Sequence, residues 1–145
     1  MRFRMPLFSF ILLAVIGTSL TVLGRQPAAT SAREGIYSEP QAKRGEIVAS
    51  QFCRSCHGSD LMGADDGPPL AGPDFVDAWK AQTVGDLFEK ISTTMPANDP
   101  GRLTPEQTAD LVAYILQMNK YPSRASDLGQ DLQLLKQTKL ESPTG

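Results

Sequence analysis

The pentapeptide Cys53-Arg54-Ser55-Cys56-His57 contains both cysteines and the only histidine of this 145-residue chain. Two thiols at this spacing, followed directly by an imidazole, are typical of covalent haem attachment. The thiols can bond to the two vinyl groups of one porphyrin, while the imidazole lies beneath the iron as its proximal ligand. We therefore expect one covalent haem c per chain, with Cys53 and Cys56 as its attachment points and His57 as a ligand of the iron.

Other uses of a Cys-x-x-Cys pair fit the chain less well. A thioredoxin-like dithiol lies beside a parallel sheet, and the sequence shows no convincing strand. A zinc site would lack ligands, because the adjacent Cys56 and His57 cannot easily face one ion and no further Cys or His pair exists. A third alternative is an exported domain without haem, in which the two cysteines form a disulfide.

A six-coordinate haem iron needs a second axial ligand, and one histidine cannot supply two imidazoles. Of the five methionines, Met1 and Met5 lie near the N-terminus, Met62 is too close to the attachment motif to reach the opposite face easily, and Met118 lies near the end of a predicted helix. Met95 remains as the expected distal ligand, although methionine is also a common gap-filling residue. A thioether opposite an imidazole raises the reduction potential, which suits an electron carrier.

The first 32 residues have the order of an export signal. Arg2 and Arg4 precede an apolar run over residues 7–23 and a stretch of small residues that ends at Ala32. The run is slightly long for a signal peptide and slightly short for a membrane span, so residues 1–32 are a signal peptide, which we favour, or an N-terminal membrane anchor. Either places the remaining chain in the periplasm or at the outer face of the inner membrane. Membrane contact is expected only if this segment is retained.

The charge balance argues against nucleic acid as a partner. The whole chain has 14 basic and 16 acidic residues, a net charge of −2. Without the three arginines of the leader, 11 basic residues remain against 16 acidic ones, a net charge of about −5. Nucleic acids bind basic surfaces, so no nucleic acid partner is expected. The expected partners are redox proteins: a donor dehydrogenase, and an acceptor oxidase or another cytochrome.

Apolar periodicity and capping residues predict helices and divide the chain. Residues 33–42 lack periodicity and are expected to form a linker, residues 43–119 the haem domain, and residues 120–145 a C-terminal extension with a short helix. The clearest helix begins after Thr104, with Pro105 at its first position and a capping box completed by Gln107. The other helices are predicted over residues 43–52, 74–80, 83–94 and 126–136.

The expected fold is all-α, with about four or five short helices and Gly/Pro-rich loops around one covalently bound haem. The helices have few large apolar residues between them, and the loop over residues 58–73 is dense in Gly, Pro and Asp. Such a loop has no core of its own to cover. A buried porphyrin would supply the missing core for both the helices and the loop.

Four motifs in this order give the chain a family resemblance: the pentapeptide 53–57, Gly67-Pro68-Pro69-Leu70, Thr94-Met95-Pro96 and Leu111-Val112-Ala113-Tyr114-Ile115. Together they resemble the class I monohaem c-type cytochromes of bacteria, small soluble or membrane-tethered proteins, over residues 43–119. The resemblance implies a class I cytochrome c-like fold in this segment, the cytochrome c domain. It also implies that the carbonyl of Pro68 binds the ring of His57, which orients the imidazole and increases its basicity.

The resemblance further implies that an N-terminal helix crosses the C-terminal helix at a glycine and an aromatic residue. Gly45 fits this glycine, and Tyr114 fits the aromatic residue of the C-terminal helix. Ala49 stands where the family usually has an upstream aromatic residue, so this part of the contact is weakened or replaced by Phe52. The departure affects the helix crossing and leaves the haem motif unchanged.

The function implied by the resemblance is periplasmic one-electron transfer, with no catalytic residues. The loop around Met95 and the final helix of the haem domain are also similar to those of cytochromes that accept electrons from pyrroloquinoline quinone (PQQ) dehydrogenases. The chain is therefore expected to be the acceptor or a subunit of such a quinoprotein dehydrogenase, or part of a respiratory chain. The alternative is a haem-based sensor or a small peroxidase, which would require a displaceable Met95.

Overall fold

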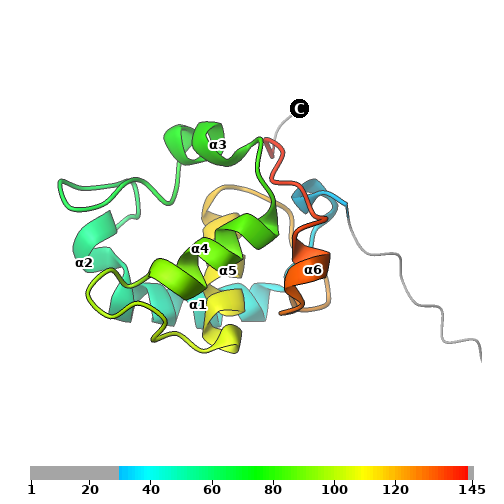
Figure 1. Cartoon of the computed structure of the whole chain (residues 1–145). Coiled ribbons are helices and arrows are strands. Elements are labelled where there is room, and N and C mark those ends of the chain that lie inside the picture. Colours follow the sequence, from blue (N-terminus) through cyan, green and yellow to red (C-terminus); the bar gives the residue numbers. More distant parts are fainter. Residues whose placement is uncertain (1–29, 144–145) are drawn as a thin grey trace, which may run out of the picture.

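The computed structural model describes residues 30–143, which form helices joined by loops. No strand occurs among these residues, only isolated bridges between single residue pairs. The predicted all-α fold is therefore confirmed, with one more α-helix than the upper number expected, a single turn within the haem-attachment motif. The elements are the 3-10 helix η1 (Ala32–Glu34) and the helices α1 (Glu39–Phe52), α2 (Arg54–His57), α3 (Pro73–Trp79), α4 (Val84–Thr94), α5 (Pro105–Met118) and α6 (Leu132–Leu135) (Figure 1).

Helices α1 and α5 form the central helix pair of the domain. Every residue of α5 from Thr108 to Leu116 is buried, and α1 buries Val48 and neighbouring small residues. The two helices cross at Gly45, where an added Cβ atom would lie 2.8 Å from the Cβ atom of Tyr114. The crossing therefore occurs at the glycine and the aromatic residue expected from the family resemblance.

Helices α4 and α5 begin where the sequence predicts, because each has a capping box. The Thr83 hydroxyl accepts a hydrogen bond from the N–H of Asp86, whose carboxylate accepts one from the N–H of Thr83. Thr104 and Gln107 make the same reciprocal pair at the start of α5. Each box satisfies two backbone N–H groups that have no partner within the helix.

Residues 33–42, predicted to be a linker, are instead part of the packed domain. Ile36 and Tyr37 are buried, and the Tyr37 hydroxyl donates a hydrogen bond to the carbonyl oxygen of Tyr121 at 2.8 Å. Ser38 caps α1, which therefore begins earlier than predicted. The prediction was wrong because this segment packs against the distant C-terminal part of the chain, which local periodicity does not report.

The predicted C-terminal extension, residues 120–145, is also part of the domain as far as residue 143. Its chain returns along the start of α4, where the N–H of Val84 donates to the carbonyl of Thr138 at 2.8 Å. The N–H of Leu140 donates to the carbonyl of Gln82 at 2.9 Å, and Leu140 is fully buried. These contacts make the segment a structural element of the domain.

Helix α6 is shorter than the helix predicted over residues 126–136. Asp131 caps it by accepting hydrogen bonds from the backbone N–H groups of the next turn. Before this cap, the N–H of Leu128 donates to the side-chain oxygen of Gln41 on α1 at 2.6 Å. This tertiary contact fixes residue 128 against α1, and the helix begins only after the cap at Asp131.

Residues 1–29 of the predicted leader lie outside the described residues. The last three leader residues pack against the C-terminal segment: the N–H of Lys139 donates to the carbonyl of Thr30, and the N–H of Ala32 donates to the carbonyl of Lys139, both at 2.9 Å. Ala32 is fully buried. Residues 30–32 are therefore packed against the described domain, and the leader boundary after residue 32 stays a prediction. Among residues 30–143, no helix combines the length and apolar character needed to cross a membrane.

Candidate haem-binding site

Cys53 directly precedes α2, and Cys56 lies within it. Cys53 is half-buried at the junction of α1 and α2, whereas Cys56 is exposed, and both are free thiols. Burial, with a smaller contribution from Cys56, raises the pKa of the Cys53 thiol to about 11. Cys53 is therefore a neutral thiol at pH 7, and neither sulfur is in a disulfide that would prevent thioether formation.

The imidazole of His57 is held in one tautomer. The residue is buried, with 7% of its surface exposed, and its Nδ1 atom lies 2.6 Å from the carbonyl oxygen of Pro68. A carbonyl oxygen only accepts hydrogen bonds, so Nδ1 carries a proton, and in the neutral imidazole Nε2 keeps its lone pair. The structure thus contains the contact with Pro68 implied by the resemblance, and this contact prepares Nε2 to bind a metal ion.

Gly67 allows the loop to approach this ring. A Cβ atom on Gly67 would lie 3.0 Å from Nδ1 of His57 and 2.8 Å from the carbonyl oxygen of Cys56. The backbones of Gly67 and Ala64 exchange hydrogen bonds of 3.2 and 3.0 Å, which closes a tight turn at this point. Because no side chain fits between the turn and the imidazole, a larger residue here would push Pro68 away from His57.

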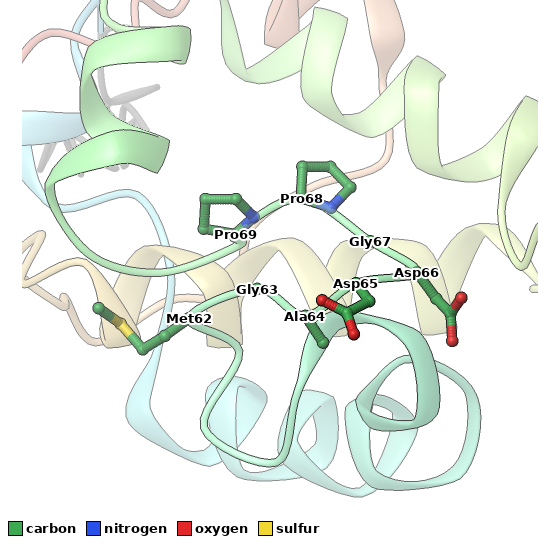
Figure 2. Close-up of a pocket in the computed structure, with 8 residues that line it drawn as sticks. All are labelled: Met62, Gly63, Ala64, Asp65, Asp66, Gly67, Pro68 and Pro69. Carbon is green, nitrogen blue, oxygen red and sulfur yellow. The ribbon is translucent and has the colours of Figure 1, made fainter.

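The same loop lines a hollow of about 450 Å³, formed by residues 62–69. Figure 2 shows the rings of Pro68 and Pro69 on one side of the loop and the carboxylates of Asp65 and Asp66 on the other. Both aspartates are exposed. The prolyl rings therefore offer an apolar surface that suits a porphyrin plane, while the charged groups remain in water.

Met95 directly follows α4, which runs from the end of the domain that holds α6 toward the end that holds α2 (Figure 1). Its N–H donates to the carbonyl of Ile91 at 3.0 Å and closes the last turn. The Met95 side chain is half-buried against the core, whereas Met62 is 50% exposed. Met95 thus leaves its helix at the end of the domain that carries the attachment motif.

The loop after Met95 contacts the residue before Cys53. The guanidinium of Arg102 lies 4.8 Å from the centroid of the Phe52 ring and pairs with Asp99 at 3.4 Å. A cation over an aromatic face contributes about 0.5–1 kcal/mol at an exposed site. This contact holds the loop after Met95 beside the C-terminal end of α1 and hence close to the attachment motif.

Two contacts near the site have no counterpart among the sequence predictions. Arg54, within the attachment motif, donates from Nη2 to the hydroxyl of Tyr114 at 3.2 Å and so ties the motif to α5. Asn119, at the end of α5, is buried and hydrogen-bonded to the backbone of residues 70–72. The only sequence signal for Asn119 is a polar amide that directly follows an apolar helix.

The residues at this end of the domain fit a covalently attached haem c. Cys53 and Cys56 supply two free thiols, and His57 supplies an imidazole with an available Nε2 atom. Pro68 orients that imidazole, and Met95 supplies a thioether at the start of a loop on the same end of the domain. This set of donors is the one that a haem with two thioether links and two axial ligands requires.

A helical domain with this attachment motif and a buried, oriented imidazole defines a c-type cytochrome. Residues 40–115 match the family model described as cytochrome C oxidase, cbb3-type, subunit III, and the chain belongs to this family. The match covers just over half of the chain and includes the attachment motif, the Pro68 loop and Met95.

Among solved structures, the chain is similar to a chain in the crystal structure of the sulfane dehydrogenase SoxCD from Paracoccus pantotrophus, with 21% sequence identity and a TM-score of 0.45. The similarity covers 71% of this chain and 61% of that chain, so this chain spans less than two thirds of that chain's length. A comparison with curated proteins gave no match.

Membership of this family establishes the cofactor and the general function. The cofactor is covalently bound haem c, as predicted, and the single Cys-x-x-Cys-His motif provides for one per chain. The general function that this family supports is electron transfer by this haem.

Proposed function

We propose that the protein is a one-electron carrier in which His57 and Met95 bind the haem iron from opposite faces. The observation that carries this proposal is the contact between His57 and Pro68, which leaves one imidazole nitrogen available for the iron. When bound, the haem supplies a couple between ferric and ferrous iron. The chain supplies the ligands, their orientation and the covering of the porphyrin.

His57 is the proximal ligand in the proposed site. Its Nδ1–H donates to Pro68, so the ring cannot turn without losing a buried hydrogen bond. The same bond increases the electron density of the ring and strengthens Nε2 as a donor. Cys56, next to it in the chain, would fix the porphyrin edge through a thioether link.

Met95 is the distal ligand in the proposed site. Among residues 30–143 the other methionines are less suited, because Met62 is half-exposed on the loop that carries Pro68 and Met118 lies in the last turn of α5. Met95 begins a loop that Arg102 ties to the attachment side. Its soft sulfur favours ferrous iron and would raise the reduction potential of the site.

The proposed location is the periplasm or the outer face of the inner membrane. Support comes from the export-type order of residues 1–32. The alternative membrane anchor would keep the domain at the membrane surface. In both cases the same domain would meet its redox partners outside the cytoplasm.

The proposed donor is a dehydrogenase, either a quinoprotein that uses PQQ or a component of a respiratory chain. The acceptor would be an oxidase or another cytochrome, and the chain would act as a free carrier or as a subunit of such a complex. The family description names a subunit of a cytochrome c oxidase, which favours the respiratory partner. The negative charge of the chain without its leader suits a partner with a basic surface.

The axial ligands can be tested by spectroscopy of the full chain matured with haem. We expect the reduced-minus-oxidised spectrum to be that of a low-spin c-type haem, and the ferric form to show thioether ligation. Met95→Ala should abolish the thioether signal, lower the reduction potential and make the reduced protein bind carbon monoxide promptly. Met62→Ala is the matched control, because it removes a methionine that is exposed and lies on the Pro68 loop.

Three outcomes would contradict the proposal. Unchanged axial ligation in Met95→Ala would show that another residue is the distal ligand. Loss of the thioether signal in Met62→Ala would assign that role to Met62. Prompt carbon monoxide binding by the unmodified reduced protein would instead favour a haem-based sensor or a small peroxidase, in which the distal position is open.

A further inference from the structure

We propose that Asn119 is a positioning residue for the proximal imidazole, because it holds the loop from which Pro68 binds His57. The inference rests on the proposed function, in which His57 is a ligand of the iron. Asn119 directly follows α5 and lies beyond residues 40–115, the part of the chain that matches the family model.

The side chain of Asn119 makes three hydrogen bonds and is only 4% exposed. Its Oδ1 atom accepts a hydrogen bond from the N–H of Gly72 at 2.9 Å, and its Nδ2 atom donates to the carbonyl of Leu70 at 2.9 Å. Nδ2 also donates to the carbonyl of Ile115 at 2.8 Å, which anchors the amide to α5. The backbone donor and acceptors leave only one possible orientation of the amide group.

The segment that Asn119 binds is the nearest anchored backbone after Pro68. Neither Pro68 nor Pro69 has an N–H group, so no backbone donor fixes the chain at these two positions. Anchoring resumes in residues 70–72, where the first two N–H groups donate to the carbonyl of Leu61 at 2.8 and 3.0 Å. The third N–H group of this segment is the one that Asn119 binds. Asn119 therefore shares with Leu61 the anchoring of the segment that follows the Pro68 carbonyl.

Loss of the amide would act on the imidazole through this segment. With residues 70–72 released on one side, the hydrogen bond between His57 and Pro68 would lengthen and weaken. A weaker hydrogen bond at Nδ1 makes the imidazole a poorer donor to iron, which favours the ferrous state and raises the reduction potential. It also exposes the Nδ1 proton to exchange with water.

The test compares two variants of the full-length holoprotein that each lose a buried amide. Asn119→Leu keeps the side-chain volume and removes the three hydrogen bonds. Gln41→Met is the matched control, because Gln41 is 2% exposed and also bridges distant backbone, with hydrogen bonds of 3.1 and 2.6 Å to Leu128. Three quantities are measured: the melting temperature, the reduction potential and the exchange rate of the His57 Nδ1 proton by NMR.

We expect both variants to lower the melting temperature. Only Asn119→Leu should raise the reduction potential and accelerate exchange of the His57 Nδ1 proton, by about tenfold for a hydrogen bond weakened by about 1.4 kcal/mol. If Asn119→Leu destabilises the fold while the potential and the exchange rate stay at the wild-type values, Asn119 is a purely structural residue and the inference is wrong.

A second variant covers the case in which Asn119→Leu does not fold. Asn119→Ser leaves a short polar side chain that cannot span from α5 to both Leu70 and Gly72. The reduction potential and the exchange rate of the His57 Nδ1 proton are measured in the same way. Failure of the proposed function would be recognised separately, because the unmodified protein would then lack an imidazole-ligated haem before any variant is compared.

Discussion

Gly45 of α1 lies so close to α5 that an added Cβ atom would be 1.9 Å from the carbonyl oxygen of Asp110 and 2.8 Å from the Cβ atom of Tyr114. No side chain fits between these two backbones. The crossing also positions the haem motif, since α1 ends at Phe52, directly before Cys53, and Arg54 donates a hydrogen bond to the hydroxyl of Tyr114. The absence of a side chain at Gly45 is thus a condition for the position of the attachment motif.

Gly45→Ala is expected to lower the free energy of unfolding of the holoprotein by about 2–3 kcal/mol, because the added methyl group forces the two helices apart. This loss exceeds the gain of about 1 kcal/mol that alanine brings as a better helix former. Denaturation with guanidinium chloride measures the difference. Gly129→Ala is the control, since nothing lies within 4 Å of an added Cβ atom there. Equal stabilities of the two variants would contradict the prediction.

Gly67→Ala is expected to weaken the hydrogen bond between His57 and Pro68, because its Cβ atom would lie 3.0 Å from the imidazole nitrogen. The reduction potential should rise, since a less basic imidazole stabilises ferric iron less well. Stability should fall by about 1–3 kcal/mol. Redox titration of the variant tests the first effect, with the exposed, uncharged neighbour Ala64→Ser as the control. A potential equal to that of the control would mean that the close contact serves packing alone.

Local signals in the sequence were sufficient for the elements whose ends are determined by nearby residues. Helix α5 begins at Pro105 because Thr104 and Gln107 form a capping box within one turn. The haem-attachment motif is similarly compact, with the thiols and the imidazole inside five consecutive residues. In both cases the interacting groups are neighbours in the chain, so their residue types and spacing carry the information.

Elements whose partners lie far along the chain were not predictable in this way. The hydroxyl of Tyr37 binds the backbone of Tyr121, 84 residues away, and this contact is part of what makes residues 33–42 a packed segment. Asn119 binds the backbone of Gly72 and of Leu70, which lie 47 and 49 residues earlier in the chain. Single-sequence periodicity reports which face of an element is apolar, but it does not report which segment covers that face.

The mature chain is expected to retain residues 30–32. Truncation to Thr30 should leave the melting temperature unchanged, whereas truncation to Arg33 should lower the free energy of unfolding by about 1–3 kcal/mol. The shorter chain loses the two backbone hydrogen bonds with Lys139, the buried Ala32 side chain and the cap of η1. Thermal denaturation compares the two holoproteins, and mass spectrometry identifies the natural N-terminus. A natural N-terminus at Arg33, or equal stability of both truncations, would refute this expectation.

Asp127 links the C-terminal segment to α1 through its carboxylate. It accepts hydrogen bonds from the hydroxyl of Ser38 and from Nη2 of Arg44, the latter at 2.8 Å. These contacts, the one with Ser38 first, lower the pKa of Asp127 below its ordinary value. Arg44 also binds the buried carboxylate of Asp110 on α5 through two hydrogen bonds of 2.9 Å. One cation therefore connects α1, α5 and the C-terminal segment.

Asp127→Asn is expected to make the stability of the holoprotein less sensitive to acid. A carboxyl group with a lower pKa in the folded state stabilises the fold above its unfolded pKa, near 4, and loses this contribution as the pH falls through the folded pKa. At pH 7 the variant should lose less than about 1 kcal/mol, because the side chain of Asp127 is 50% exposed. Its decline in stability below about pH 4 should then be shallower than that of wild type. Denaturant unfolding at several pH values measures both effects, with the exposed Asp66→Asn as the control. If the free energy of unfolding falls equally steeply below about pH 4 in Asp127→Asn and in wild type, the contact with Ser38 and Arg44 does not contribute to stability.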